Sequence, residues 1–254
     1  MHRGDHVDNP AGDPCATRAR PTTATTATTA TTATIPACHN RPMEHLHRVI
    51  GPIATNVHIL ADARTREAVA IDTATPSLAW IAEELAERDW TLKLIISSHG
   101  HWDHIGDNAA VAEHTGAEIA VHPLDRDRLT DPKPLWAPFE IVPSVPAVDL
   151  AEGGQIRFGE ICLQVLHTPG HTEGSVCLLD ADGGRLFSGD TLFAGGWGRV
   201  DLPGGDPTAM AGSLARLSGL EDALAVYPGH GSSTTIGRER AWLELVRDGG
   251  RLFA

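Results

Sequence analysis

The stretch His99-Gly100-His101-Trp102-Asp103-His104 decides how this chain is interpreted. It follows Leu92–Ser97, an apolar run that predicts a buried β-strand. Three imidazoles and a carboxylate therefore lie within one short segment at the end of a strand. Both are ligand types that Zn and Fe accept in proteins. Crowding such groups without a cation would cost stability, so the segment predicts a metal site.

The spacing inside this segment predicts two ions. A loop leaving a strand can turn alternate side chains to one side, so we expect His99 and His101 to hold one ion. Asp103 and His104 would then point toward a second. A single histidine beside glycine is usually a surface or hydrogen-bonding residue, but the dense cluster makes further ligands necessary. Three positions that follow apolar runs and adjoin glycine are the candidates: His171, Asp190 and His230.

Composition limits the class of protein. The chain has 254 residues, of which 41% are hydrophobic and 21% charged, and it can build a core. No apolar run approaches the ~20 residues of a membrane helix, so we expect no membrane partner. The formal charge of −13 repels phosphate backbones, so we expect no nucleic-acid partner.

The cysteines indicate the compartment. The chain contains four cysteines and no Cys-x-x-Cys pair, which favours reduced thiols over a disulfide framework. We therefore expect a cytoplasmic protein. The four are Cys15, Cys38, Cys162 and Cys177.

The first 42 residues differ from the rest. Residues 22–34 form a Thr/Ala-rich repeat that has no apolar periodicity and cannot offset its ordering entropy. We expect residues 1–42 to be a disordered tail, and a sharper hypothesis is that translation starts at Met43. Residues 43–254 are predicted to form one domain.

Short apolar runs and longer amphipathic segments follow one another along this domain. We expect strands, then helices, then strands, then helices, which predicts an α/β protein with two packed sheets and outer helices. A proline-rich loop at 131–146 carries Trp136 and Phe139. The expected strands are 48–50, 55–60, 68–71, 92–97, 118–121, 155–158, 162–167, 175–179, 186–188 and 223–227, and the expected helices are 77–88, 107–114, 207–217 and 237–247.

The ligand pattern resembles the metallo-β-lactamase superfamily across roughly 43–247. Residues 198–206 and 226–240 narrow the resemblance to its small glyoxalase II-type hydrolases, the hydroxyacylglutathione hydrolase group. The resemblance implies a four-layer αββα sandwich of the α+β kind with two divalent metal ions at one edge. Zinc is the expected metal, although Fe and Mn accept the same ligands. The resemblance further implies that one ion is held by His99, His101 and His171 and the other by Asp103, His104 and His230, with Asp190 bridging.

Several positions depart from the family pattern. Val200 replaces a usual threonine, and Thr73-Ala74 stands where Pro-Gly is common. The chain ends at Ala254 without the helical domain that binds glutathione in longer glyoxalase II enzymes, so glutathione specificity does not follow. Phe193, where lactonases tend to have tyrosine, argues against a lactonase. A ligand set without cysteine argues against a true β-lactamase.

The expected activity is hydrolysis of a small-molecule thioester of the S-2-hydroxyacyl-glutathione type. Two cations would share a water and lower its pKa from ~15.7 toward ~7, and the resulting hydroxide would attack the carbonyl. Asp103 would be the catalytic residue, because it both binds metal and orients the hydroxide. Arg199 is predicted to bind substrate, or alternatively to pair with Asp201 or Asp206. Phe193 and Trp197 are predicted to line the substrate pocket, with core packing as the alternative.

Other functions remain open from the sequence. A persulfide dioxygenase would use a single iron at His99, His171 and Asp190, which are present either way. Another hydrolase of the same fold is a further alternative. A non-catalytic protein would be expected to lack ligands, and all seven are here. The sequence does not predict the oligomeric state.

Overall fold

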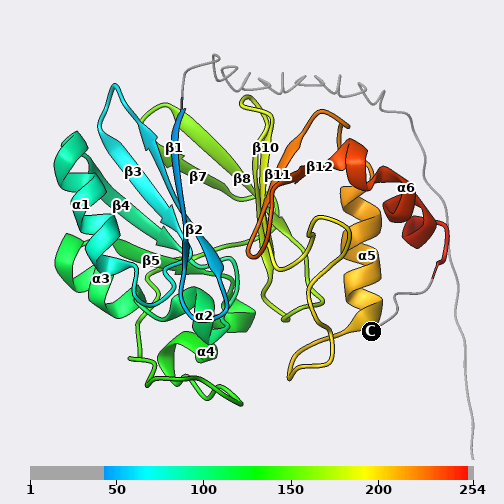
Figure 1. Cartoon of the computed structure of the whole chain (residues 1–254), viewed down its shortest axis with the longest axis horizontal. Coiled ribbons are helices and arrows are strands. Elements are labelled where there is room, and N and C mark those ends of the chain that lie inside the picture. Colours follow the sequence, from blue (N-terminus) through cyan, green and yellow to red (C-terminus); the bar gives the residue numbers. More distant parts are fainter. Residues whose placement is uncertain (1–42, 251–254) are drawn as a thin grey trace, which may run out of the picture. The chain divides into compact units, whose positions relative to one another are not determined.

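Two six-stranded sheets form the centre of the protein in a computed structural model, which describes residues 43–250 (Figure 1). The expected tail at 1–42 lies outside the described residues. In the first sheet β1–β3 are antiparallel, and β3 to β6 run parallel. Its strands are β1 (Met43–Ile50), β2 (Thr55–Asp62), β3 (Glu67–Ile71), β4 (Thr91–Ile96), β5 (Glu118–Val121) and β6 (Val148–Asp149).

The second sheet is mostly antiparallel. Strands β7 to β10 form a meander, β10 pairs in parallel with β11, and β12 closes the edge. Its strands are β7 (Gln155–Phe158), β8 (Ile161–His167), β9 (Val176–Asp180), β10 (Arg185–Gly189), β11 (Ala225–Pro228) and β12 (Thr234–Thr235). Side chains of β7 alternate between exposed and buried, as expected for a strand with one face on the core.

Apolar side chains join the sheets and attach the helices. One buried cluster lies between the sheets and includes Leu60, Ile96 and Phe187. A second cluster packs α1 (Leu78–Arg88) and α3 (Asn108–Thr115) on the first sheet. A third packs α5 (Pro207–Leu217) and α6 (Ile236–Arg247) on the second. The four-layer αββα sandwich is therefore confirmed (Figure 1).

The structure adds elements that the sequence did not predict. A short helix α2 (Trp102–Ile105) begins inside the histidine-rich segment, and the turn η1 (Pro123–Asp125) leads into α4 (Arg126–Thr130). Strands β6 and β12 were also missed. The expected loop at 131–146 has no helix or strand. No helix within 43–250 is long and apolar enough to cross a membrane.

The start of α1 is capped by a residue from another segment. Ser77 stands at the N-cap, but its side chain makes no capping hydrogen bond. Asp107, just before α3, instead accepts hydrogen bonds from the backbone N–H groups of Ser77 and Leu78 at 2.6 and 2.9 Å. A carboxylate from a distant segment thus satisfies donors that a helix start leaves unpaired.

Candidate metal centre

Seven candidate ligands converge where strands of both sheets end. The first sheet supplies the segment 99–104, which follows β4 and enters α2. The second sheet supplies the others from loops that each follow a strand: His171 after β8, Asp190 after β10 and His230 after β11. The structure therefore brings all seven sequence-predicted residues to one place.

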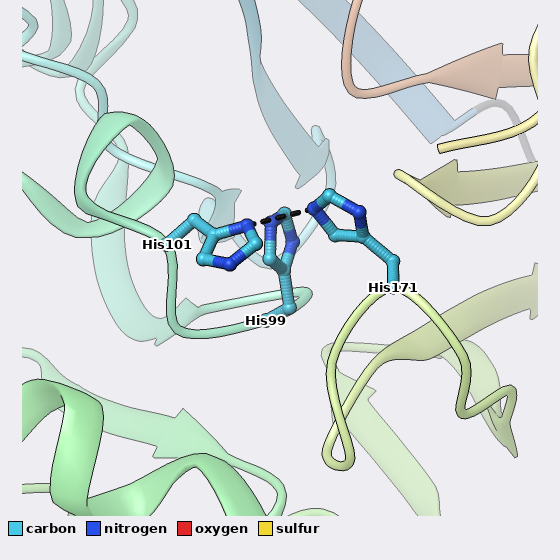
Figure 2. A group of neighbouring side chains, drawn as sticks. All are labelled: His99, His101 and His171. Carbon is cyan, nitrogen blue, oxygen red and sulfur yellow. Dashed lines mark hydrogen bonds between the residues drawn. The ribbon is translucent and has the colours of Figure 1, made fainter. Parts of the chain in front are cut away.

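His99, His101 and His171 form the first group. One nitrogen of each ring lies within 4.8 Å of the others. Figure 2 shows His99 and His101 extending from one loop toward His171 on another. The distance from His101 Nδ1 to His171 Nε2 is 2.7 Å. Three imidazoles from two sheets thus direct nitrogens toward one small volume.

Asp103, His104 and His230 form the second group. His104 Nε2 lies 3.0 Å from Asp103 Oδ2, and His230 Nε2 lies 3.2 Å from the same oxygen. The two imidazole nitrogens are 3.2 Å apart. This group mixes two imidazoles and a carboxylate, which is a ligand set suited to Zn or Fe.

Asp190 lies between the two groups. Its Oδ2 is 3.4 Å from His171 Nε2 in the first group and 3.6 Å from His230 Nε2 in the second. Its Oδ1 is 3.5 Å from His104 Nε2. The residue before His230 must be glycine, because a Cβ on Gly229 would lie 2.2 Å from Asp190 Oδ1. One carboxylate therefore faces both groups.

Asp72, at the end of β3, orients ligands from behind. Its carboxylate accepts hydrogen bonds from His104 Nδ1 at 2.8 Å and from Ser98 Oγ at 2.9 Å. Since Ser98 donates its only proton to Asp72, its oxygen accepts from His99 Nδ1 at 3.1 Å. The protons on Nδ1 of His99 and His104 leave each Nε2 directed at the site.

A backbone carbonyl holds the imidazole of His171, and a side-chain amide holds the loop of His230. His171 Nδ1 donates to the carbonyl oxygen of Arg199 at 2.7 Å, which leaves Nε2 as the inward nitrogen. The loop of His230 is fixed by Asn56 on β2, whose side-chain amide donates to Pro228 and Gly231 carbonyls at 2.8 and 3.0 Å. Asn56 therefore connects the first sheet to a ligand loop of the second.

Asp125 connects the two loops of the first group. Its carboxylate is fully buried and accepts hydrogen bonds from the backbone N–H groups of Gly100 and Gly174 at 2.7 and 3.0 Å. It also accepts one from Thr172 Oγ1 at 2.7 Å. Gly100 lies between His99 and His101, and Thr172 follows His171, so one side chain holds both loops in register.

The site separates neutral from charged groups. Burial, together with the electrostatic influence of the neighbouring His171, lowers the pKa of His101 to about 2. Burial also lowers the pKa of His99 well below its usual value. Burial alone would lower the pKa of His104 too, but the carboxylates of Asp103, Asp72 and Asp190 raise it well above its usual value. Neutral imidazole is the form that binds metal, and crowded carboxylates attract cations.

Two unpartnered atoms test whether a cation fits. Among the described side chains, His99 Nε2 and Asp190 Oδ1 are buried and have no hydrogen-bond partner. Leaving such atoms unpaired costs about 1–3 kcal/mol each. Both atoms belong to the ligand groups, and a bound cation would satisfy both. The donor set therefore fits metal ions.

A cavity of about 1010 Å³ opens in front of the candidate ligands. The three residues predicted to bind substrate, Arg199, Phe193 and Trp197, all line it. The guanidinium of Arg199 makes two hydrogen bonds to Asp201, at 2.9 and 2.8 Å, which is the pairing anticipated as the alternative. Trp136 also lines the cavity. Phe139 instead packs against Trp102 and the outer core.

Sequence reasoning missed the residues that support the ligands. Asp72 and Asp125 occupy the same kind of position as the ligands, shortly after an apolar strand, and that signal could have found them. Asn56 lies within a strand whose residues are all buried, where a polar side chain needs a partner. That requirement was the available signal for Asn56.

Comparison with known proteins identifies the family. The family model described as the metallo-beta-lactamase superfamily matches residues 50–230. An uncharacterized protein of Aquifex aeolicus is 37% identical over 201 residues, covering 76% of this chain and 92% of that protein. The hydroxyacylglutathione hydrolase GloC of Haemophilus influenzae is 32% identical, covering 63% of this chain and 78% of that protein. The chain belongs to the metallo-β-lactamase superfamily.

Solved structures agree on the fold and differ in name. The B3 metallo-beta-lactamase BLEG-1 has a TM-score of 0.70 at 33% identity, covering 78% of this chain and 97% of that one. ETHE1 from Myxococcus xanthus has a TM-score of 0.68 at 31% identity, covering 81% of this chain and 85% of that one. TTHA1623 in a di-iron-bound form has a TM-score of 0.69 at 35% identity, covering 76% of this chain and 96% of that one. Hydroxyacylglutathione hydrolases among the sequence relatives agree with the subgroup to which the motifs pointed.

Proposed function

We propose that this chain is a metal-dependent hydrolase that cleaves a small-molecule thioester of the S-2-hydroxyacyl type. The observation that carries the proposal is the pair of unpartnered buried atoms, His99 Nε2 and Asp190 Oδ1, inside a set of seven converging ligands. Relatives named hydroxyacylglutathione hydrolase support the substrate class. Zinc is the proposed metal and the cytoplasm the proposed compartment.

The proposed ligand assignment follows the distances. His99, His101 and His171 would hold one divalent cation, Asp103, His104 and His230 a second, and Asp190 would face both. Divalent cations bound there would lower the pKa of a bound water toward about 7 and polarise a carbonyl oxygen.

Asp103 is the proposed catalytic residue. Its Oδ2 faces His104 Nε2, His230 Nε2 and the hydroxyl of Thr55, which donates to it at 3.1 Å. Its Oδ1 is therefore the oxygen that we propose accepts a hydrogen bond from the attacking water. Burial opposes ionisation, yet the neighbouring imidazoles hold the pKa of Asp103 well below its usual range, so it acts as an acceptor. A thiolate is a good leaving group, so no strong general acid is required.

Metal quantification together with thioester hydrolysis tests the proposal. The purified wild-type protein should carry up to two divalent ions per chain and hydrolyse S-lactoylglutathione. Asp103→Ala and His101→Ala should each abolish turnover and lower metal content by up to one ion per chain. Glu113→Ala, at an exposed position on α3, is the control and should match wild type.

Two outcomes would contradict the proposal. Full turnover by Asp103→Ala or His101→Ala would remove the site assignment. One iron per chain with oxygen uptake on a persulfide would favour the dioxygenase over the hydrolase.

A further inference from the structure

Three apolar side chains that line the cavity are exposed to solvent. Ile53, in the turn between β1 and β2, is 44% exposed. Leu135 and Trp136, in the loop after α4, are 77% and 60% exposed. All three side chains line the same cavity, and exposed apolar side chains gathered in this way mark a place where an apolar group binds. We define Ile53, Leu135 and Trp136 as the apolar wall.

The apolar wall is attached to the metal-binding segment. The ring of Trp136 lies edge-on to Trp102, with centroids 5.3 Å apart at 83°. Trp102 lies between the candidate ligands His101 and Asp103, and Phe139 also packs edge-on against it at 5.6 Å. Such aromatic contacts add roughly 0.5–1.5 kcal/mol beyond their area. Trp136 is therefore held in place beside the candidate metal centre.

The charged residues of the cavity are balanced by carboxylates. Arg128 donates to Glu173 at 3.0 Å and to the carbonyl of Pro203 at 2.8 Å. Lys133 pairs with Asp131, which also lines the cavity. Arg199 pairs with Asp201, as described above. The positive side chains of the lining are thus already paired with carboxylates and offer little free charge to a substrate with several carboxylates. The side chains of the apolar wall, in contrast, remain exposed to solvent.

We infer that the substrate carries an apolar substituent that packs on the apolar wall, on either the acyl or the thiol side of the thioester. The inference rests on the proposed function and narrows its substrate class. Each CH₂ buried on the wall should raise kcat/KM about fourfold, until the wall is covered.

Two series of substrates test the inference. The first varies the acyl group of N-acetylcysteamine thioesters from acetyl to hexanoyl. The second varies an S-alkyl group on a fixed lactoyl thioester. kcat/KM should rise with chain length in at least one series, and Trp136→Ala should flatten that dependence. Leu245→Ala, an exposed apolar residue on α6 outside the cavity, is the matched control and should keep it.

A binding measurement separates this inference from the proposed function. S-alkyl thioethers of N-acetylcysteamine lack the scissile carbonyl, and their Kd for the metal-loaded protein is measured by calorimetry. We expect the Kd to fall with each added CH₂ in wild type and to lose this dependence in Trp136→Ala. That result would support binding of an apolar substituent at the apolar wall even if no thioester were hydrolysed, and only the hydrolase proposal would then fail.

The inference fails under two results. Hydrolysis and binding that do not depend on chain length would overturn it while leaving the hydrolase in place. A wild-type oligomer that becomes monomeric in Trp136→Ala, measured by sedimentation equilibrium, would show the wall to be an interface between copies of this chain.

Discussion

The buried carboxylate of Asp125 accepts a hydrogen bond from the backbone N–H of Gly100, at 2.7 Å, between His99 and His101. The same carboxylate holds Thr172 and Gly174, which follow His171 on the other loop. The distance between His101 and His171 therefore depends on a residue that is not itself a candidate ligand.

Asp125→Ala should weaken metal binding at the first group. The variant removes three hydrogen bonds and leaves two backbone donors unpaired, so the loops lose their common attachment. We expect metal affinity to fall about 10–100-fold, as for other residues that orient ligands. Competition with a chelator measures the affinity, and circular dichroism checks that the variant is folded.

A conservative variant and a control variant accompany Asp125→Ala. Asp125→Asn keeps one acceptor oxygen and should bind metal with intermediate affinity. Asp149→Ala removes an exposed carboxylate that pairs with Arg126 and should bind like wild type. Wild-type affinity in Asp125→Ala would refute the positioning role.

Asn56→Ala should act on the second group instead. Without the side-chain amide, the carbonyls of Pro228 and Gly231 lose their donor and the loop of His230 is less fixed. We expect one of two ions to dissociate more easily while the other keeps its affinity. Metal titration that resolves two steps measures this, and His47→Gln, which keeps a donor toward Asn56 Oδ1, is the control. Equal weakening of both steps would contradict the assignment.

Arg199→Ala should raise KM severalfold with little change in kcat, if Arg199 binds substrate. Its pair with Asp201 is exposed on both sides and contributes little to stability, so the guanidinium can exchange Asp201 for a substrate carboxylate. The backbone carbonyl that orients His171 remains in the variant. An unchanged KM with a lower free energy of unfolding, matched by Asp201→Ala, would assign Arg199 to structure alone.

His45 predicts a pH dependence of stability away from the metal centre. Burial, with the positive charges of Arg185 and His47, lowers the pKa of His45 to about 4. The unfolded chain takes up this proton near pH 6.5, but the folded protein does so only near pH 4. The contribution of His45 to the free energy of unfolding is therefore constant above pH 6.5, falls as the pH drops to 4, and then levels off.

The variant His45→Gln isolates this contribution. An amide still reaches His58 Nδ1, which lies 3.0 Å from His45 Nε2, but it does not titrate in this range. Urea unfolding from pH 8 to 4 should show a shallower loss of stability than in wild type. His114→Gln, at an exposed position, should follow wild type. A slope identical in His45→Gln and wild type would contradict the lowered pKa.

The sequence singles out the candidate ligands because they share a local pattern. His99, His171, Asp190 and His230 each follow an apolar strand and adjoin or precede glycine, so residue type and position were both visible. The sandwich is predictable for the same reason, since runs such as Leu92–Ser97 have a clear apolar pattern. The structure confirms the four layers, and it places these residues close together.

Long-range contacts are what the sequence does not reveal. Nothing local connects Asp125 with Gly174, 49 positions later, or Asn56 with Pro228, 172 positions later. The short elements α2 and β12 span too few residues to display a period. Nothing local connects Asp107 with the start of α1, 30 positions earlier, whose backbone N–H groups donate to its carboxylate.

The candidate ligands belong to both sheets, so loss of metal would affect stability as well as turnover. A cation held by His101 and His171 at once would join positions 70 residues apart, much as a reversible cross-link does. An ion present at a thousand times its Kd stabilises the native state by about 4.1 kcal/mol. Scarcity of metal would then loosen the attachment of one half of the molecule to the other as well as stop turnover. Survival of the folded chain against proteases would thereby report on the supply of metal.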